Sequence, residues 1–362
     1  MRILITNLII SFIVASASSV IAAEKPPLKN TKVAKLAIQD ELPVGKSATE
    51  FPAAPSWQQL PSGELGEKVL RGYSYFVNSQ QLAPKYVGNG LNCVNCHMDA
   101  GKKENAAPLW AAYMSYPAYR KKNDKINAFQ ERLQGCFLYS MNGTPPIMGD
   151  DTLVDLSAYA YWLAQATLGN GVGAKFTAAD IPVPTDAELL QGGKRDDFPF
   201  MPAYLAAGGS TTPVLPGRGY PKIDEPTLPG DITRGKVVYQ QQCVACHGSN
   251  GQGQQVNQRY VFPPLWGPDS YNWGAGMQRV NTAAYFIKHN MPLGMPNSLS
   301  DQEAWDVASY LDSRDRPQDP RYQGDIKQTR RQFHGNTSYY GTEVDGKILG
   351  NASYPNHPNK GQ

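Results

Sequence analysis

The sequence is poor in cysteine and histidine and has little excess of either charge. Its 362 residues include five Cys and five His, and 34 Lys and Arg nearly balance 31 Asp and Glu, giving a formal net charge of +3. No basic stripe is present, which excludes a nucleic-acid-binding surface of the usual kind. After the N-terminus, no stretch approaches the roughly 20 apolar residues of a membrane helix.

The N-terminus holds the one long apolar run. Arg2 precedes apolar residues from Ile3 to Val14, and small residues follow as far as Ala23. A basic start, a short apolar run and a small-residue end are typical of a cleaved signal peptide, here residues 1–23. We therefore expect export to the periplasm and no integral membrane segment in the mature chain. An uncleaved N-terminal anchor is the alternative.

Two short motifs contain four of the five cysteines. They are Cys93-Val-Asn-Cys96-His97 and Cys243-Val-Ala-Cys246-His247. Covalent haem attachment needs two thiols for the two vinyl groups of one porphyrin and an adjacent His for the iron, and Cys-x-x-Cys-His supplies both. A redox dithiol needs no following His, and a zinc site needs two more close ligands. We therefore predict two covalently bound haem c groups, attached through these four cysteines, with His97 and His247 on the irons.

Each motif lies near the start of a segment that ends in a helical pattern. Ser300 and Glu303 form a capping box before one such helix, and Thr152 is expected to cap its counterpart in the first segment. We predict an all-α fold of two tandem cytochrome c-like domains with long loops and an irregular C-terminal tail. The expected divisions are an N-terminal arm (24–58), domain 1 (59–180), a Pro/Gly-rich linker (181–228), domain 2 (229–316) and a polar extension (317–362).

The second haem has several candidates for its sixth ligand. Met291 lies downstream of the motif and just before the capped helix, where small cytochromes c place a loop methionine. A thioether ligand favours ferrous iron and suits a domain that passes electrons onward. Met295 and His289 are the alternatives, and His289 would give a lower potential.

For the first haem the candidates are Cys136, Met141 and Met148. Cys136 lies about forty residues after His97, a reach that suits a loop over the distal face. Ferric iron binds thiolate strongly, and such a ligand lowers the potential and points to catalysis. A buried, inert cysteine is the competing interpretation.

Polar and basic residues flank Cys136. Arg120, Lys121, Lys122 and Arg132 supply positive charge, while Ser140 and Asn142 supply neutral donors. Guanidinium groups bind sulfate-like oxygens with paired hydrogen bonds, so an oxyanion substrate is expected here. A solvated helix face would explain the same basic residues.

These segments resemble the dihaem thiosulfate dehydrogenases, periplasmic enzymes that couple thiosulfate to tetrathionate. The similar segments are Glu131-Arg132-Leu-Gln-Gly-Cys136-Phe-Leu-Tyr-Ser140-Met-Asn142-Gly143, His289-Asn290-Met291-Pro292-Leu293-Gly294 and Leu299-Ser300-Asp301-Gln302-Glu303-Ala304-Trp305. The first is the specific one, since Cys-x-x-Cys-His alone fits many cytochromes.

The resemblance implies roles for individual residues. Cys136 and His97 would ligate the active-site iron, and Met291 and His247 the second iron. Arg132 and Ser140 match substrate-pocket positions of the family, and Arg120 matches less closely. Some relatives have Lys at the position of Asn290, and that lysine can compete for the iron. This chain has Asn there, so it lacks the competing ligand.

The resemblance also implies a reaction and partners. The substrates would be thiosulfate and tetrathionate, and the electron acceptor would be a small cytochrome or similar carrier. The reaction would be reversible, so that tetrathionate could also be reduced. Cys136 would bond to one thiosulfate and be released by a second. A non-catalytic dihaem electron carrier with Met on both irons is the main alternative. A dihaem peroxidase, which would draw on His289, His334 or His357, is the third.

Overall fold

The structure is a computed structural model that describes residues 54–113, 116–120, 123, 125–169, 219–257, 259–351 and 354. The expected signal peptide, most of the N-terminal arm and most of the linker lie outside these residues. In the described part of the chain, no helix is long and apolar enough to cross a membrane.

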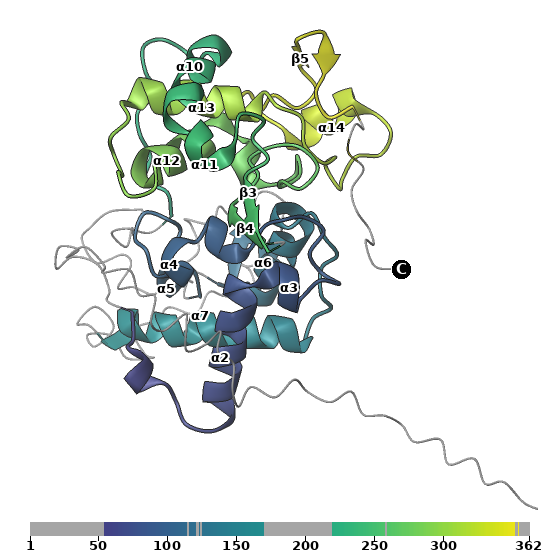
Figure 1. Cartoon of the computed structure of the whole chain (residues 1–362). Helices are drawn as coiled ribbons and strands as arrows, with labels where there is room; N and C mark the ends of the chain where they lie inside the picture. Colours follow the sequence, from purple (N-terminus) through teal and green to yellow (C-terminus); the bar gives the residue numbers. More distant parts are fainter. Residues whose placement is uncertain are drawn as a thin grey trace, which may run out of the picture.

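Helices dominate both halves of the chain, which confirms the all-α prediction (Figure 1). The first half contains η2 (Trp57–Gln59), α2 (Glu64–Val77), α3 (Ser79–Leu82), η3 (Cys93–Asn95), α4 (Met98–Gly101), α5 (Leu109–Ala112), β1 (Ala118–Arg120), β2 (Lys125–Asn127), α6 (Phe129–Gly135), η5 (Cys136–Ser140) and α7 (Asp151–Gly169). The second contains α10 (Ile232–Gln242), α11 (Val244–His247), β3 (Gln254–Val256), β4 (Arg259–Phe262), η9 (Gly276–Gln278), α12 (Val280–Asn290) and α13 (Asp301–Asp312). Each strand pair, β1–β2 and β3–β4, is an antiparallel hairpin.

Both halves are built on the same crossing of a first and a last helix. Gly72 of α2 lies against the backbone of Asp155 in α7, and Gly235 of α10 lies against the backbone of Asp306 in α13. A Cβ on either glycine would clash with the carbonyl oxygen of the facing Asp. The two backbones approach so closely because glycine has no side chain.

An ion pair lies beside each crossing. Arg71 Nε donates to Asp155 Oδ2 at 2.6 Å, and Arg234 Nε donates to Asp306 Oδ2 at 2.7 Å. Both carboxylates are buried, and both arginines directly precede the crossing glycine. The repeat thus extends from the haem motifs to an Arg-Gly pair on the first helix and an Asp on the last.

The last helices begin differently from each other. Ser300 caps α13 and forms the predicted capping box with Glu303, whose side chain accepts from the Ser300 backbone at 2.7 Å. The Thr152 prediction was wrong, because the side chain of Asp150 accepts from the Thr152 N–H at 2.9 Å. A carboxylate two residues earlier serves as the cap, as Asp commonly does.

The two halves have separate apolar cores that meet along a junction. Tyr271 and Ala275 follow β4 in the chain but pack into the first core. Asn272 Nδ2 donates to the Leu138 carbonyl at 2.8 Å, and the Gly90 N–H donates to the Asp269 carbonyl at 3.0 Å. The 269–275 segment therefore ties the second half to the first.

The C-terminal extension is less irregular than its composition predicts. It contains α14 (Ile326–Phe333) and the hairpin of β5 (Glu343–Val344) and β6 (Lys347–Ile348). Tyr340 and Leu349 pack on Trp273 in a small third core. The extension is thus attached to the segment that bridges the two halves.

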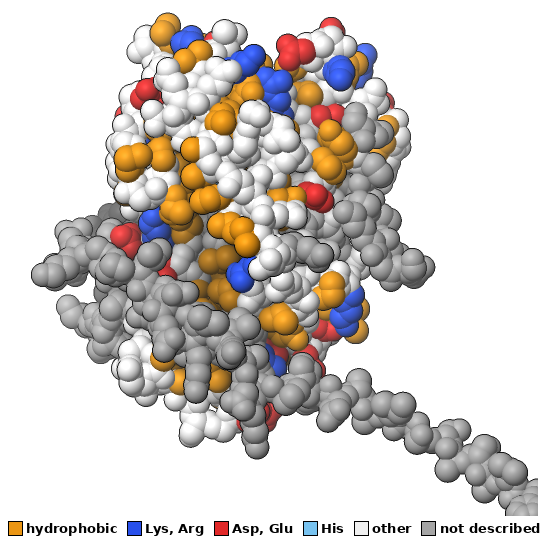
Figure 2. All heavy atoms as spheres, in the orientation of Figure 1, with side chains coloured by type: hydrophobic (Ala, Val, Ile, Leu, Met, Phe, Trp, Pro, Cys, Tyr) orange, Lys and Arg blue, Asp and Glu red, His pale blue; other side chains and the backbone are white. Residues whose placement is uncertain are grey.

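The surface matches the near-neutral composition. On the face shown in Figure 2, basic and acidic side chains are interspersed, and hydrophobic side chains gather near the junction of the halves.

Candidate functional site

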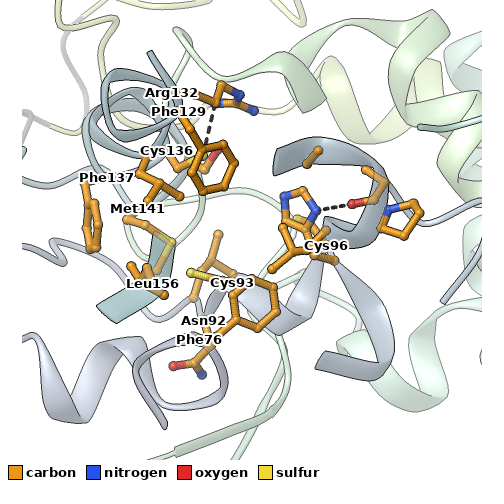
Figure 3. A pocket seen from close by; sticks show the side chains of 18 of the residues that line it. Phe76, Asn92, Cys93, Cys96, Phe129, Arg132, Cys136, Phe137, Met141 and Leu156 are labelled. Carbon is orange, nitrogen blue, oxygen red and sulfur yellow. Dashed lines mark hydrogen bonds between the residues drawn. The ribbon is translucent and has the colours of Figure 1, made fainter. Parts of the chain in front are cut away.

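A cavity of about 240 Å³ lies in the first half, around the first cysteine motif (Figure 3). Packed protein interiors contain few voids larger than a water molecule, so an apolar space of this size is shaped for an occupant. Its walls come from α2, α5, α6, η5 and α7. The residues lining it are Phe76, Leu91, Asn92, Cys93, Cys96, His97, Ala107, Pro108, Leu109, Ala112, Tyr116, Phe129, Arg132, Leu133, Cys136, Phe137, Ser140, Met141, Leu156 and Gly219.

His97 is prepared to bind a metal. Its Nδ1 lies 2.6 Å from the Ala107 carbonyl, to which it donates, so the lone pair of the neutral ring is on Nε2. Burial, and to a smaller extent the charge of Arg132, lowers the pKa of His97 to about 4, against the opposing effect of the Ala107 bond. The imidazole is therefore neutral at physiological pH, the form that ligates iron.

The second motif has the same arrangement. His247 Nδ1 lies 2.9 Å from the Pro263 carbonyl, and burial lowers its pKa. Among the described residues, no group of three or more His, Cys, Asp and Glu side chains could hold a metal ion by itself. A zinc site at either motif would need such a group. Paired thiols, a neutral imidazole and, at the first motif, an apolar cavity fit haem c.

Cys136 faces the cavity that contains the first motif. It is the first residue of η5, a turn of π-helix that continues α6 without a break. Such turns are rare and occur often at functional sites. In Figure 3 Cys136 and Arg132 lie together on one side of the cavity, and Cys93 and Cys96 lie on another. A ligand between these groups would contact the sulfur of Cys136.

Arg132 is in direct contact with that sulfur. Its Nη1 donates to Cys136 Sγ at 3.0 Å, across one turn of helix. The charge of Cys136 raises the pKa of Arg132, so the guanidinium stays protonated although the site is apolar. Arg132 therefore places a fixed positive charge beside the cysteine sulfur that faces the cavity.

Of the other predicted pocket residues, one lines the cavity and one lies near Arg132. Ser140 lines the cavity with Arg132. Arg120, at the end of β1, also approaches α6: a Cβ on Gly135 would lie 3.8 Å from Arg120 Nη1 and 3.9 Å from Arg132 Nη1. Lys121 and Lys122 lie outside the described residues.

Asn142 is not part of the cavity wall. Its side-chain oxygen accepts from Asn272 Nδ2 at 3.0 Å, at the junction of the halves. Its Nδ2 is buried without a hydrogen-bond partner, so the expectation that it offers a donor stays a prediction.

Two tyrosines near Cys136 were missed from the sequence. Tyr116 lines the cavity and is hydrogen-bonded to Arg132. Tyr220, from the segment that enters the second half, reaches the Cys96 carbonyl at 3.5 Å, and its phenol lies near Arg132. Neither stands out among the 20 tyrosines of the chain, because only the fold brings them to the site.

The candidate methionine ligands differ in how far their side chains are exposed to solvent. Met141 is buried at the cavity, whereas Met148 is 51 % exposed. In the second half, Met291 directly follows α12 and packs against the core, whereas Met295 is 56 % exposed. Met291 therefore lies in the better position for an iron ligand.

The remaining histidines differ in whether a ring nitrogen is left for iron. His289 Nδ1 lies 3.0 Å from Asn297 Oδ1, and its buried Nε2 has no hydrogen-bond partner, so His289 stays an alternative ligand for the second haem. Buried His334 has both ring nitrogens in hydrogen bonds, to Ser338 and Asp319. His357 lies outside the described residues.

Comparison with known proteins identifies a family for each part of the chain. The cytochrome c family model matches residues 232–315, in the second half, and confirms haem c as the cofactor. The chain is 46 % identical over 310 residues to the thiosulfate dehydrogenase of Stutzerimonas stutzeri (strain A1501), covering 84 % of this chain and 87 % of that protein. It is 44 % identical over 342 residues to the thiosulfate dehydrogenase of Thiomonas intermedia (strain K12), covering 94 % and 93 %.

A solved structure is similar over both halves. The thiosulfate dehydrogenase (TsdBA) from Marichromatium purpuratum, in its "as isolated" form, superposes with a TM-score of 0.68 at 40 % sequence identity. The match covers 84 % of this chain and 58 % of that one, so this chain spans a little over half the length of that protein. Identity of this extent over nearly the whole chain, together with the cavity around Cys136, shows that the chain belongs to the thiosulfate dehydrogenase family.

Proposed function

We propose that the protein joins two thiosulfate ions to form tetrathionate and passes the two electrons to an external cytochrome or similar carrier. The reverse reaction would use the same site. The observation that carries the proposal is the position of Cys136: its sulfur faces the cavity of the first haem motif, with Arg132 Nη1 3.0 Å away. The full-length similarity to thiosulfate dehydrogenases supports the same substrate.

The geometry of the two sites supports one set of iron ligands. We assign His97 and Cys136 to the first iron, and His247 and Met291 to the second. Cysteines 93, 96, 243 and 246 attach the porphyrins. Bound haem supplies one-electron sites, one in each half, that together accept the two electrons of the reaction.

Cys136 acts as the nucleophile in this scheme. Its thiolate and the outer sulfur of one thiosulfate form an S–S bond, and the pair loses two electrons. The outer sulfur of a second thiosulfate then attacks the adduct, so that tetrathionate forms and Cys136 leaves as thiolate. Atoms and charge balance: two dianions lose two electrons and give one dianion, and the cysteine is regenerated.

Arg132 and its neighbours have two tasks in this scheme. Two thiosulfate dianions repel each other strongly in a partly desolvated cavity, and a fixed cation offsets that repulsion. Arg132 Nη1 also donates a hydrogen bond to the leaving sulfur of Cys136. We assign Ser140 and Arg120 to the sulfonate oxygens. This assignment is supported by the position of Ser140 in the cavity wall and by the approach of Arg120 Nη1 to Gly135, beside Arg132 Nη1.

The expected location is the periplasm, after removal of residues 1–23. The acceptor is a soluble redox protein, and the near-neutral surface gives it no strong electrostatic signature.

The direct test uses haem-loaded protein purified from the periplasm. Thiosulfate is expected to reduce ferricyanide in its presence, and tetrathionate is expected to oxidise a reduced viologen dye. If protein with two attached haems shows neither activity, the proposal is overturned in favour of the electron carrier.

The spectrum of the oxidised protein gives a second, independent test. Thiolate-bound and Met-bound low-spin haems differ in their charge-transfer bands in the near infrared. Two methionine-type bands, and none of the thiolate type, would remove Cys136 from the iron and with it the proposed nucleophile.

A further inference from the structure

A hydrogen bond connects the sixth-ligand loop of the second haem to the loop that supports His97. Asn290 is the last residue of α12 and directly precedes Met291. Its Nδ2 donates to the Asn105 carbonyl of the first half at 2.9 Å and to the Phe286 carbonyl within α12 at 3.1 Å. The Asn290 side chain is fully buried, so water does not compete for these bonds.

The loop that receives this bond has an unfavourable backbone conformation. Asn105 has φ 61° and Ala107 has φ 50°, both in the left-handed region. Asn tolerates that region, whereas the Cβ of Ala makes it unfavourable. The Ala107 carbonyl is the acceptor for His97 Nδ1, so this strained residue sets the hydrogen bond of the iron ligand.

Two hydrogen bonds to the loop come from outside the first half. Asn290 binds the Asn105 carbonyl, and the Gly219 carbonyl accepts from the Ala107 N–H at 2.8 Å. A strained conformation persists only where its surroundings hold it. The bond to the Gly219 backbone is insensitive to side-chain substitution, whereas the bond from Asn290 depends on one amide.

We infer that Asn290 is a positioning residue that couples the Met291 loop of the second haem to the hydrogen bond of His97 at the first haem. The inference rests on the ligand assignments proposed above. Strong donation from His97 to Ala107 makes the imidazole a more basic ligand and favours ferric iron. Movement of Met291 would therefore change the potential of the first haem, and loss of the Asn290 bond would raise it.

The test compares variants of the haem-loaded protein in a spectroelectrochemical titration. Asn290→Ser is the informative change, because a Ser hydroxyl retains the bond to the carbonyl four residues earlier but is too short to reach Asn105. We expect the equilibrium at the first haem to shift toward ferrous iron by about fivefold, the low end for coupled sites. The ferric EPR g values of that haem are expected to change as well.

Asn297→Gly is the matched control, since it alters an exposed residue of the same loop whose φ of 64° suits glycine. It is expected to leave the potential and the g values of the first haem unchanged.

A second variant, Asn290→Leu, is similar in size and has no donor. It repeats the test if the Ser variant loads haem poorly. An unshifted potential and unchanged g values of the first haem, in a variant whose second haem keeps its wild-type spectrum, would overturn the coupling. Thiosulfate oxidation by the wild type is measured separately, so failure of the proposed function is distinguishable from failure of this inference.

Discussion

Arg132 and Cys136 lie one helical turn apart, with the guanidinium Nη1 3.0 Å from the sulfur. The turn between them passes from α-helix to π-helix at Cys136, so the sulfur faces the cavity while the backbone remains continuous. This pairing places a cation, a nucleophile and the first cysteine motif in one apolar space. Each member of the pair is the subject of one prediction.

Replacing Cys136 with Gly is expected to abolish thiosulfate oxidation while leaving both haems attached. The nucleophile is lost, and losses of about 10³-fold or more are typical when a nucleophile is removed. Turnover with ferricyanide and the haem content of the purified variant are the measurements. Met148→Leu, at an exposed methionine of the same half, is the control and should retain activity. Wild-type activity in the Cys136→Gly variant would refute the proposed role.

Arg132→Lys is expected to lower kcat/KM for thiosulfate by about 10- to 100-fold. Lysine keeps the charge but lacks the planar donors, and a hydrogen bond to a charged group contributes roughly 1.5–3 kcal/mol. Steady-state kinetics on haem-loaded protein measure the effect. The same exchange at exposed Arg331 controls for the substitution itself. Equal kinetics in the two variants would contradict a role for Arg132.

Met291→Leu is expected to remove the methionine charge-transfer band of the second haem and to lower its potential. A thioether stabilises ferrous iron, and axial ligands span a range of roughly 0.8 V. A redox titration followed in the visible region separates this haem from the first. Met295→Leu should change neither property, because that side chain is 56 % exposed. The opposite pattern would transfer the ligand role to Met295.

The pKa values of Asp319 and His334 lead us to expect that the folded state loses stability as the pH falls. Burial alone would raise the pKa of Asp319, but hydrogen bonds from His334 and Arg321 outweigh it and lower that pKa. Burial lowers the pKa of His334 below its ordinary value of 6.5. Both groups bind protons more weakly in the folded state, so their contribution is complete above about pH 6.5 and is lost as the pH falls, first through His334.

Thermal unfolding between pH 5 and pH 7.5 measures this dependence. His334→Gln is expected to flatten the decline in Tm below pH 6.5. An unchanged slope in that variant would assign the decline to other groups.

The helix crossings predict two sites of severe destabilisation. Gly72→Ala and Gly235→Ala would each push a methyl group into the backbone of the facing helix, at Asp155 and Asp306. Because a carbonyl oxygen cannot move without its helix, we expect a loss of about 3 kcal/mol or more, the upper end for overpacking. Denaturant unfolding of haem-loaded protein provides the measurement. Gly276→Ala, where the added methyl meets no atom within 4 Å, is expected to change stability by well under 1 kcal/mol. Equal losses at all three positions would contradict the crossing geometry.

The sequence by itself determined the local chemistry. Cys-x-x-Cys-His contains both the attachment thiols and the first iron ligand within five consecutive residues, so no fold is needed to recognise it. The capping box at Ser300 is equally local and was predicted correctly. The Asp150 cap was missed because Ser, Thr and Asp compete for such positions within two residues of one another.

The tertiary structure decided which residues from distant segments share one site. Tyr116 and Tyr220 approach Cys136, Asn142 turns to the junction of the halves, and Asn290 reaches Asn105 across 185 residues. The close approach at Gly72 and Gly235 likewise depends on where two helices cross. Periodicity and motifs describe neighbours along the chain, whereas packing and hydrogen bonds join groups whose separation in sequence carries no signal.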